Sequence, residues 1–248
     1  MIFADSHLHI TDLAFWQPLS DGPDVSPVCS CAHSEDEWKR LLAVAEKYPG
    51  LVLRSAGVHP QNPDKKHMAF VLGALEKNEA DAVGEAGFDL YSDEFSSRVK
   101  EQEEVWALQL EAAQRYEKPM VIHCRRALDR IFRDAKKLAK LKSAVFHSFA
   151  GSDTEALSLI KRGVNAHFSF GKPLLNGNKR ALRCAALLPF DLLLAETDAP
   201  WQTLKGETAT DPADIKKVYE KIASLRGENP AAVCERLYKN FKNAYGLV

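Results

Sequence analysis

The sequence has few cysteines and no apolar stretch long enough to cross a membrane. It contains 5 cysteines in 248 residues and no Cys-x-x-Cys pair, which argues against a disulfide framework and against a structural zinc knuckle. Its apolar runs stay well below the roughly 18 residues of a transmembrane helix. The N-terminus shows no basic segment followed by a cleavage site. We therefore expect a cytoplasmic protein that does not contact a membrane.

The chain also lacks a strong net charge. Its 33 Lys and Arg against 34 Asp and Glu give a formal net charge of -1, which excludes a basic surface for non-specific nucleic-acid binding. An anionic substrate must then be bound by local positive charges. The length and the 46% of hydrophobic residues suit either one large α/β barrel or two small domains. We expect a single domain over residues 1–248, with no obligate protein partner.

Short β-rich runs alternate with helical patterns along the whole chain. This alternation is typical of repeated βα units and a parallel sheet. The eight runs that we predict as strands are residues 2–7, 28–31, 51–57, 80–85, 120–123, 144–147, 165–170 and 192–196. Eight such strands favour a closed (β/α)8 TIM barrel.

His7 and His9 stand two residues apart at the end of the first predicted strand. Side chains at positions i and i+2 of a strand point to the same side, so both imidazoles can bind one ion. Neutral imidazole is a common ligand for zinc and similar divalent metals. An isolated His-x-His fits equally well with one histidine in the core and one in a loop. The other strand ends must decide between these alternatives.

Further metal-binding residue types close the later predicted strands. Glu85, His123 and His147 close the fourth, fifth and sixth, and Glu196 and Asp198 lie two residues apart at the eighth. In a (β/α)8 barrel, residues at these strand ends converge on the face that carries catalytic groups. Each alone has a structural explanation, but their shared position argues against independent accidents. Four histidines and two carboxylates exceed the ligands of one tetrahedral zinc, so we expect two divalent ions, with Glu85 as the candidate bridge.

Six motifs carry these residues in a fixed order. They are His7-Leu8-His9, Gly57-Val58-His59-Pro60, Gly84-Glu85-Ala86-Gly87-Phe88-Asp89, His123-Cys124-Arg125-Arg126-Ala127-Leu128-Asp129, His147-Ser148-Phe149-Ala150-Gly151-Ser152 and Glu196-Thr197-Asp198-Ala199-Pro200. By these motifs the chain resembles the TatD family of metal-dependent hydrolases, whose members are described as deoxyribonucleases. The resemblance implies a (β/α)8 barrel of the metal-dependent hydrolase type. It implies the following metal ligands: His7, His9, Glu85, His123, His147 and Asp198.

The resemblance also implies an activity. It indicates a deoxyribonuclease that hydrolyses phosphodiester bonds from a DNA end, with Asp198 as general base and Glu85 bridging two ions that activate water. An alternative with the same metals is hydrolysis of a small amide, ester, lactone or phosphodiester. Zn, Mn, Mg, Ni and Co are not distinguished by these ligands. Residues 206–212 replace the family's usual downstream segment, which leaves the substrate less certain than the activity class.

Four residues near the strand ends are candidates for substrate contacts. Arg125 has the forked guanidinium that suits phosphate, and His59 and Lys172 follow the third and seventh predicted strands. Trp201 could stack a base. Three of them also have a structural alternative, namely loop ordering for His59, a solvated loop position for Lys172 and a core anchor for Trp201.

Two acids are expected to support the metal ligands rather than bind metal. Glu196 and Asp5 lie two residues before ligands on the same strand face, and metal ligands normally need such partners. Cys124 is expected to pack outward from the barrel. Histidines with no companion at ligand spacing are predicted to be surface or structural residues: His33, His67 and His167.

Overall fold

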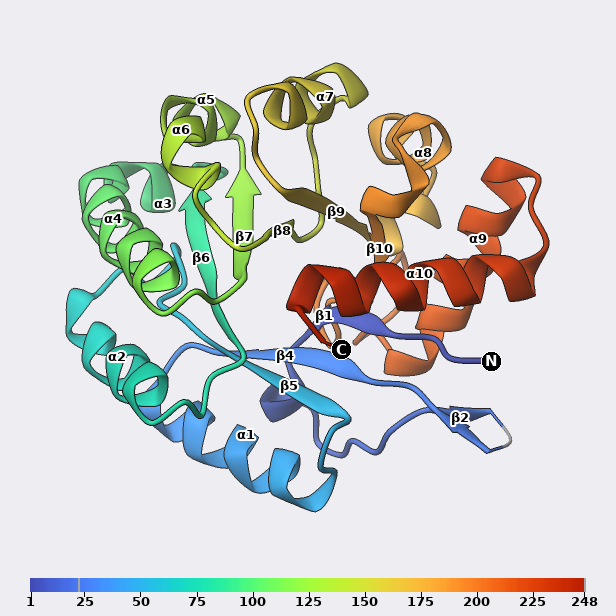
Figure 1. Cartoon of the computed structure of the whole chain (residues 1–248), viewed down its shortest axis with the longest axis horizontal. Helices are drawn as coiled ribbons and strands as arrows, with labels where there is room; N and C mark the ends of the chain where they lie inside the picture. The colour runs from blue at the N-terminus through green and yellow to red at the C-terminus, as the bar shows by residue number, and fades with distance from the viewer. Residues whose placement is uncertain (22, 248) are drawn as a thin grey trace.

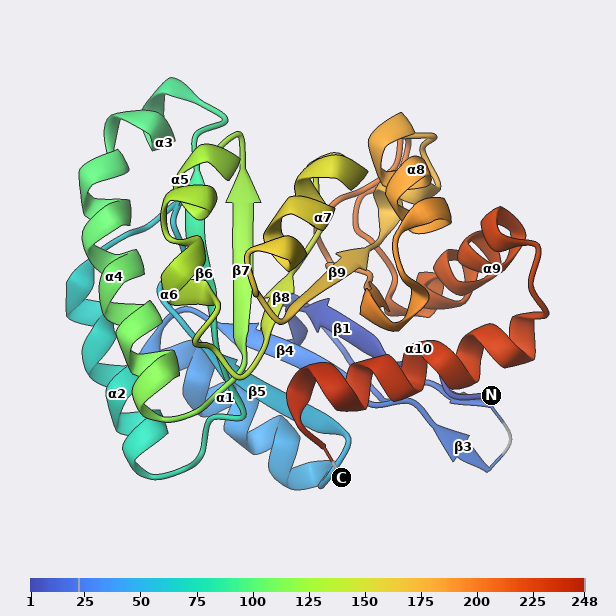
Figure 2. The ribbon, with the colours of Figure 1, turned by 45° about the horizontal axis from the view of Figure 1, so that its top comes forward.

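The computed structural model describes residues 1–21 and 23–247, and in these ranges eight parallel strands form a nearly closed barrel surrounded by helices (Figures 1 and 2). Their spatial order is β1 (Asp5–Leu8), β4 (Val28–Ala32), β5 (Val52–Ala56), β6 (Ala82–Asp89), β7 (Met120–Arg125), β8 (Ala144–Phe146), β9 (Ala166–Phe170) and β10 (Leu193–Ala195). Backbone bonds join the two ends of this order, from Asp198 N to His7 O (3.0 Å) and from His9 N to Ala199 O (2.8 Å). The predicted (β/α)8 barrel is confirmed.

The observed bounds of several strands differ from the predicted bounds. β6 and β7 extend to Asp89 and Arg125, beyond the predicted ends at residues 85 and 123, and β1 begins at Asp5 rather than residue 2. A small antiparallel pair, β2 (Ser20–Asp21) and β3 (Asp24–Val25), was not predicted. The extra length of β6 and β7 brings Asp89 alongside Arg125.

Helices follow most strands and cover the outside of the barrel. They are α1 (Glu35–Lys47), α2 (Met68–Glu76), α3 (Asp93–Ser97), α4 (Val99–Arg115), α5 (Leu128–Arg133), α6 (Ala135–Leu138), α7 (Asp153–Lys161), α8 (Lys179–Leu187), α9 (Ile215–Arg226) and α10 (Pro230–Tyr245). Ser34 caps α1, since its side chain accepts a hydrogen bond from Glu37 N. In the described part of the chain, no helix combines the length and apolar character that a membrane crossing requires.

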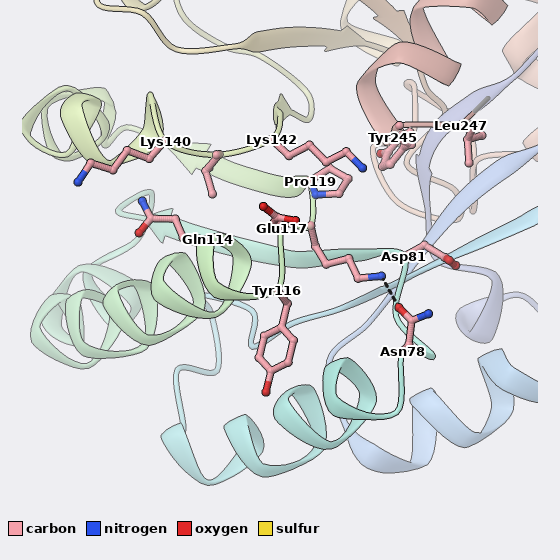
Figure 3. A pocket seen from close by; sticks show the side chains of 13 residues that line it. Asn78, Asp81, Gln114, Tyr116, Glu117, Pro119, Lys140, Lys142, Tyr245 and Leu247 are labelled. Atoms are coloured by element: carbon pink, nitrogen blue, oxygen red, sulfur yellow. Dashed lines mark hydrogen bonds between the residues drawn. The ribbon is translucent and has the colours of Figure 1, made fainter.

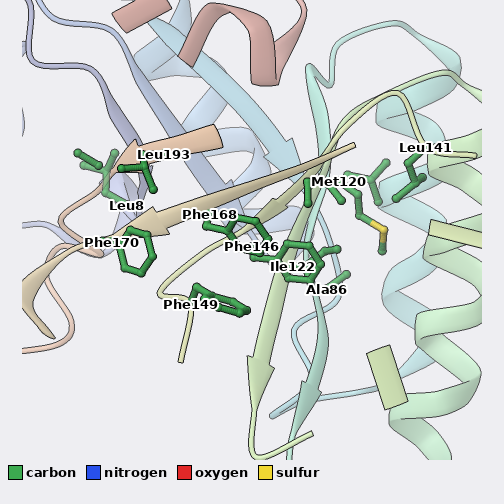
Figure 4. Close-up of a cluster of buried hydrophobic side chains, with 14 of the residues drawn as sticks. Leu8, Ala86, Met120, Ile122, Leu141, Phe146, Phe149, Phe168, Phe170 and Leu193 are labelled. Carbon is green, nitrogen blue, oxygen red and sulfur yellow. The ribbon is translucent and has the colours of Figure 1, made fainter. Parts of the chain in front are cut away.

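Apolar side chains fill two layers, one between the strands and the outer helices and one inside the barrel. The outer layer includes Phe146, Phe149 and Phe168, which lie together in Figure 4; the Phe146 and Phe168 rings stack at 5.5 Å. The inner layer consists mostly of smaller residues, and α10 covers it with Phe241, Ala244 and Tyr245. Aromatic packing therefore concentrates outside the barrel, while small side chains leave room inside it.

The N-terminal end of the barrel is closed by α10. Tyr245 Oη donates a hydrogen bond of 2.6 Å to Ser6 O, and Asn240 Nδ2 donates to Phe190 O (2.7 Å) and Leu193 O (2.9 Å). A pocket of about 680 Å³ lies outside this closure, lined by residues that precede β6, β7 and β8 and by the end of α10 (Figure 3). The predicted site residues lie at the opposite end of the strands.

Candidate metal centre

Glu85 lies at the centre of the C-terminal face, and its two carboxylate oxygens face different histidines. Oε2 lies 3.4 Å from His7 Nε2 and 3.6 Å from His9 Nε2. Oε1 lies 2.5 Å from His123 Nδ1 and 2.7 Å from His147 Nε2. One carboxylate thus separates two groups of imidazole nitrogens, which is the arrangement expected of a bridging ligand.

Two glycines explain why β6 can place Glu85 there. Gly84 and Gly87 have φ angles of +142° and +146°, which glycine adopts without steric cost. A Cβ on Gly87 would lie 2.0 Å from His123 O, and one on Gly84 would lie 2.4 Å from Val121 O. The backbones of β6 and β7 therefore approach too closely for side chains at these positions, and this approach brings Glu85 next to His123.

Asp198 completes the group around His7 and His9. Its Oδ1 lies 3.4 Å from His7 Nε2 and 3.3 Å from His9 Nε2. Its Oδ2 accepts a hydrogen bond of 2.7 Å from Gln202 Nε2, which also lies 2.7 Å from Ser148 Oγ. The two oxygens of Asp198 therefore have separate partners, the histidines on one side and Gln202 on the other.

The charges of this cluster fit a divalent cation. In the described ranges, the ion pairs of Glu85 and Asp198 come from histidines alone. Burial would raise the pKa of Glu85, but His147 and the other imidazoles hold it well below its usual range. Burial also opposes charge on His147, yet Glu85 raises the pKa of this imidazole to about 10. Buried carboxylates that need positive charge, with imidazole nitrogens around them, are a suitable donor set for metal.

His7 Nε2 gives independent support for this fit. This nitrogen is buried and has no hydrogen-bond partner within the described residues. An unpaired buried polar atom costs free energy, and here it faces the Oε2 and Oδ1 atoms of the two carboxylates. A metal ion in this position would give the nitrogen a partner.

Neighbouring side chains lie close to three of the candidate imidazole ligands. Asp89 Oδ2 lies 3.2 Å from His123 Nε2, Cys31 Sγ lies 3.5 Å from His7 Nδ1, and Glu196 Oε1 lies 3.7 Å from His147 Nδ1. Glu196 Oε1 accepts a hydrogen bond of 2.7 Å from Ser148 N, and its supporting role for His147 stays a prediction. Asp89 and Cys31 were not predicted in this role, although Asp89 belongs to one of the six motifs.

Asp5 supports the backbone rather than an imidazole. Its Oδ1 accepts hydrogen bonds from His7 N and Thr197 N (both 3.1 Å), and its Oδ2 accepts one from Thr197 Oγ1 (2.6 Å). Burial raises the pKa of Asp5 to about 7, against the lowering effect of these hydrogen bonds. Asp5 thus ties β1 to the segment after β10, and so brings His7 and Asp198 together.

His33 belongs to the site, contrary to the prediction that it is a surface or structural residue. Its ring lies between His9 and His59, with centroid distances of 5.3 and 5.0 Å. Its Nε2 lies 3.8 Å from Glu85 Oε2. The i, i+2 rule could have found it, because Cys29, Cys31 and His33 alternate along β4 and its extension; the predicted strand stopped at residue 31.

The predicted substrate contacts fall into two classes. All four line one cavity of about 710 Å³ together with most of the candidate metal ligands, but Lys172 differs from the other three because carboxylates already pair with it. His59 Nε2 lies 3.3 Å from Glu85 Oε1. Trp201 is 55% exposed and donates a hydrogen bond from Nε1 to Asp12 Oδ2 (3.2 Å), so it stands at the rim and not in the core.

Lys172 does not offer a free positive charge to a substrate. Its side chain is buried, and Nζ contacts both oxygens of Glu207 (2.9 and 2.7 Å) and Asp214 Oδ2 (2.5 Å). Two carboxylates already neutralise this ammonium group. We therefore correct the expectation that Lys172 contacts the substrate. Its contacts instead hold the loop that carries Glu207 against the barrel.

Comparison with known proteins places this geometry in a family. The sequence profile described as TatD related DNase matches residues 4–246. The chain belongs to this family. It is 30% identical over 224 residues to the 3'-5' ssDNA/RNA exonuclease TatD of Escherichia fergusonii, covering 85% of this chain and 84% of that protein. TatD family membership makes the protein a hydrolase that acts on ester bonds, with phosphodiesters as the characteristic class.

A second TatD relative matches in both sequence and structure. The uncharacterized metal-dependent hydrolase YjjV of Escherichia coli K12 is 29% identical over 257 residues, covering 96% of this chain and 95% of that protein. The crystal structure of YjjV superposes with a TM-score of 0.84 at 25% identity and covers 99% of this chain. The family relationship therefore extends over the whole barrel.

Proposed function

We propose that this protein is a metal-dependent deoxyribonuclease that removes nucleotides from a DNA end. The observation that carries the proposal is the position of Glu85, whose two oxygens face separate histidine groups at the floor of an open pocket. The similarity to the 3'-5' ssDNA/RNA exonuclease TatD of Escherichia fergusonii supports the choice of a nucleic-acid strand as substrate and of cleavage from an end.

The proposal includes two divalent metal ions. His7, His9, Asp198 and Glu85 Oε2 would hold one, and Glu85 Oε1, His123 and His147 would hold the other: this assignment follows the distances above. Such ions supply Lewis-acid activation of water and of a phosphoryl oxygen.

The chain's own residues would perform the remaining steps. Asp198 accepts the proton of the attacking water on Oδ2, the oxygen that Gln202 orients. Arg125, at the pocket wall, binds phosphate through its planar fork. Exposed Trp201 offers a stacking surface for a base at the rim.

Cleavage of end-labelled single-stranded DNA tests the function. We expect stepwise shortening with added Mn²⁺ or Mg²⁺, and no shortening with chelator. A 5' label and a 3' label, used in separate reactions, give the direction. If well-folded, metal-loaded protein leaves DNA intact but hydrolyses a small amide, ester, lactone or phosphodiester, the nuclease proposal is wrong and the alternative substrate class replaces it.

Glu85→Gln tests the bridging role. An amide nitrogen cannot coordinate a metal as the second carboxylate oxygen does, so we expect the bound metal to fall from about two ions per chain towards one. Elemental analysis of purified protein measures this, with Asp81→Asn at the other end of the barrel as control. An unchanged metal content in Glu85→Gln would remove the bridge from the proposal.

We also propose that residues 1–248 act as one domain. Strands from both ends of the chain support this, because β1 and the segment after β10 share backbone hydrogen bonds. The cytoplasmic location and the lack of an obligate protein partner stay predictions from the sequence.

A further inference from the structure

Two arginines and a tyrosine form a compact group beside the metal-site pocket. The guanidinium carbon of Arg125 lies 3.5 Å from the centroid of the Tyr91 ring, and that of Arg126 lies 4.6 Å from the same centroid. We call these three residues the Arg–Tyr cluster. All three are exposed to solvent. A guanidinium stacked on an aromatic face keeps its N–H edges available for other partners.

The Arg–Tyr cluster is fixed relative to the metal ligands. Asp89 accepts a hydrogen bond from Tyr91 N at Oδ1 (2.9 Å) while its Oδ2 contacts His123 Nε2 (3.2 Å). Arg126 Nη1 in turn donates to Tyr91 O (3.3 Å). One carboxylate therefore connects the tyrosine to a predicted metal ligand, and the position of the cluster is set by the same contacts that set His123.

The positive charges of the cluster are not neutralised by acids. Some other arginines of the chain do pair with carboxylates, as Arg54 does with Asp81 and Arg183 with Asp153. Within the described ranges, Arg125 and Arg126 appear in none of the ion pairs closer than 4.0 Å. In a protein with a net charge of only -1, two adjacent unpaired guanidiniums form a local anion-binding surface of the kind that phosphate requires.

The cluster lies further from the floor of the pocket than the metal ligands do. Arg125 follows His123 by two positions in β7, which places its Cα about 6 to 7 Å further along the strand. Arg125 lines the pocket, whereas Tyr91 and Arg126 lie just outside its lining. A phosphate bound by both arginines would therefore be a different one from the phosphate over Glu85.

We infer that the Arg–Tyr cluster binds a second phosphate of the substrate strand, next to the phosphodiester that is cut. The inference rests on the proposed nuclease function and narrows its substrate to a polynucleotide rather than a mononucleotide ester. Arg125 can contact either phosphate from the wall, and Arg126 contacts only the second. The cluster then sets the strand's register in the pocket.

Strand binding to metal-loaded protein tests this inference. Asp198→Asn serves as the turnover-silenced background, and fluorescence anisotropy measures the affinity for a labelled oligothymidylate as salt is varied. We expect Arg126→Met to weaken binding about tenfold, since a charge-assisted hydrogen bond is lost. We also expect the log–log salt slope to become shallower by about 0.7, the value for one phosphate contact on a single strand. Arg115→Met, which removes an arginine stacked on Tyr116, is the matched control and should change neither quantity.

An oligothymidylate with one neutral methylphosphonate identifies the phosphate. When the methylphosphonate stands next to the cut, we expect the oligothymidylate to bind Asp198→Asn more weakly, by the same factor as Arg126→Met weakens binding. Combining the methylphosphonate with Arg126→Met should cause no further loss of affinity. Additive losses, or unchanged affinity and slope in Arg126→Met, would overturn the inference. DNA cleavage by the wild type is scored separately: its absence, with the Arg126 effect on binding intact, would contradict the nuclease function and leave the phosphate site standing.

Discussion

The two ends of the barrel are built from the same strands but differ in how their polar groups are satisfied. At the N-terminal end, Tyr245 bonds Ser6 O, and Arg54 forms a two-point pair with Asp81 through Nε (2.9 Å) and Nη2 (3.2 Å). At the C-terminal end, Glu85 and Asp198 are buried among imidazoles and have no lysine or arginine partner in the described ranges. The residues that stabilise the fold therefore lie at the N-terminal ends of the strands, and the candidate site residues lie at their C-terminal ends, as in (β/α)8 barrels generally.

Single strands illustrate this division. In β4, Cys29 packs in the inner apolar layer beside α10 and Cys31 contacts His7, and His33, just after β4, reaches the pocket. Each step of two residues moves from the closed end towards the open one. Among residues on the inner side of this strand, the position along the strand therefore decides whether a side chain packs in the core or reaches the pocket.

The largest expected effect contrasts a carboxylate at each end. We expect Asp198→Asn to lower the turnover of DNA by about a thousandfold while the protein stays folded, because the proton acceptor is lost. Asp81→Asn should instead lower stability and keep turnover, since Asp81 pairs with Arg54 and does not line the metal-site pocket. Nuclease assays and urea unfolding of both variants measure this. Normal activity in Asp198→Asn would remove that residue from the proposed mechanism.

A lysine at each end gives the next contrast. Lys172→Met leaves Glu207 and Asp214 without their shared cation, and we expect the free energy of unfolding to fall by about 3 kcal/mol, as when one partner of a buried pair is removed. Lys118→Met at the closed end removes an exposed contact to Asn78 Oδ1 (2.8 Å). This variant should change the free energy of unfolding by less than about 0.5 kcal/mol. Equal losses in urea unfolding would contradict the assigned role of Lys172.

Replacing a glutamine at each end of the barrel should give a smaller difference in activity. Gln202→Leu removes the donor to Asp198 Oδ2, and we expect kcat on DNA to fall about tenfold, the lower range for partners of metal ligands, with little change in KM. Gln114→Leu, which loses an exposed bond to Lys137 O at the other end (2.7 Å), is the control. A larger change in KM than in kcat would indicate that Gln202 contacts the substrate instead.

The cysteine thiols at the two ends of the barrel should differ very little in reactivity. Burial raises the pKa of Cys124, in the pocket wall, to about 12, and raises that of Cys29 at the closed end well above its usual value. Little reactive thiolate exists at pH 8 in either case. We expect slow labelling of the native protein by a disulfide reagent and 5 thiols per chain after unfolding. Rapid labelling of Cys124 would show an accessible thiol in the site.

The barrel and its convergent strand ends could be predicted from the sequence because they depend on local periodicity. Alternation within strands gave His7 with His9 and Glu196 with Asp198, and strand direction brought Glu85 to the same face. His33 was missed because the predicted strand ended at residue 31, one residue before the end of β4 and two before His33. Boundaries are set by pairing with neighbouring strands, which the sequence of one strand does not contain.

Long-range pairing could not be predicted either. Lys172 meets Glu207 across 35 positions of sequence, and Gln202 meets Ser148 across 54. A lysine after a strand looks the same whether its partner is a phosphate or a carboxylate from another loop. Only the fold of the segment after β10 decides between these two partners.

The buried ammonium of Lys172 also limits how the enzyme can change over evolutionary time. The segment from residue 201 to residue 211 borders the pocket through Trp201, Gln202 and Thr203 and is a natural place for substrate preference to diverge. Glu207 within it shares Lys172 with Asp214 of the following turn. A transplanted loop without an acid at that point would leave the lysine underpaired beside the pocket. The loop and Lys172 must therefore be inherited or exchanged together, as one module, when specificity is redesigned.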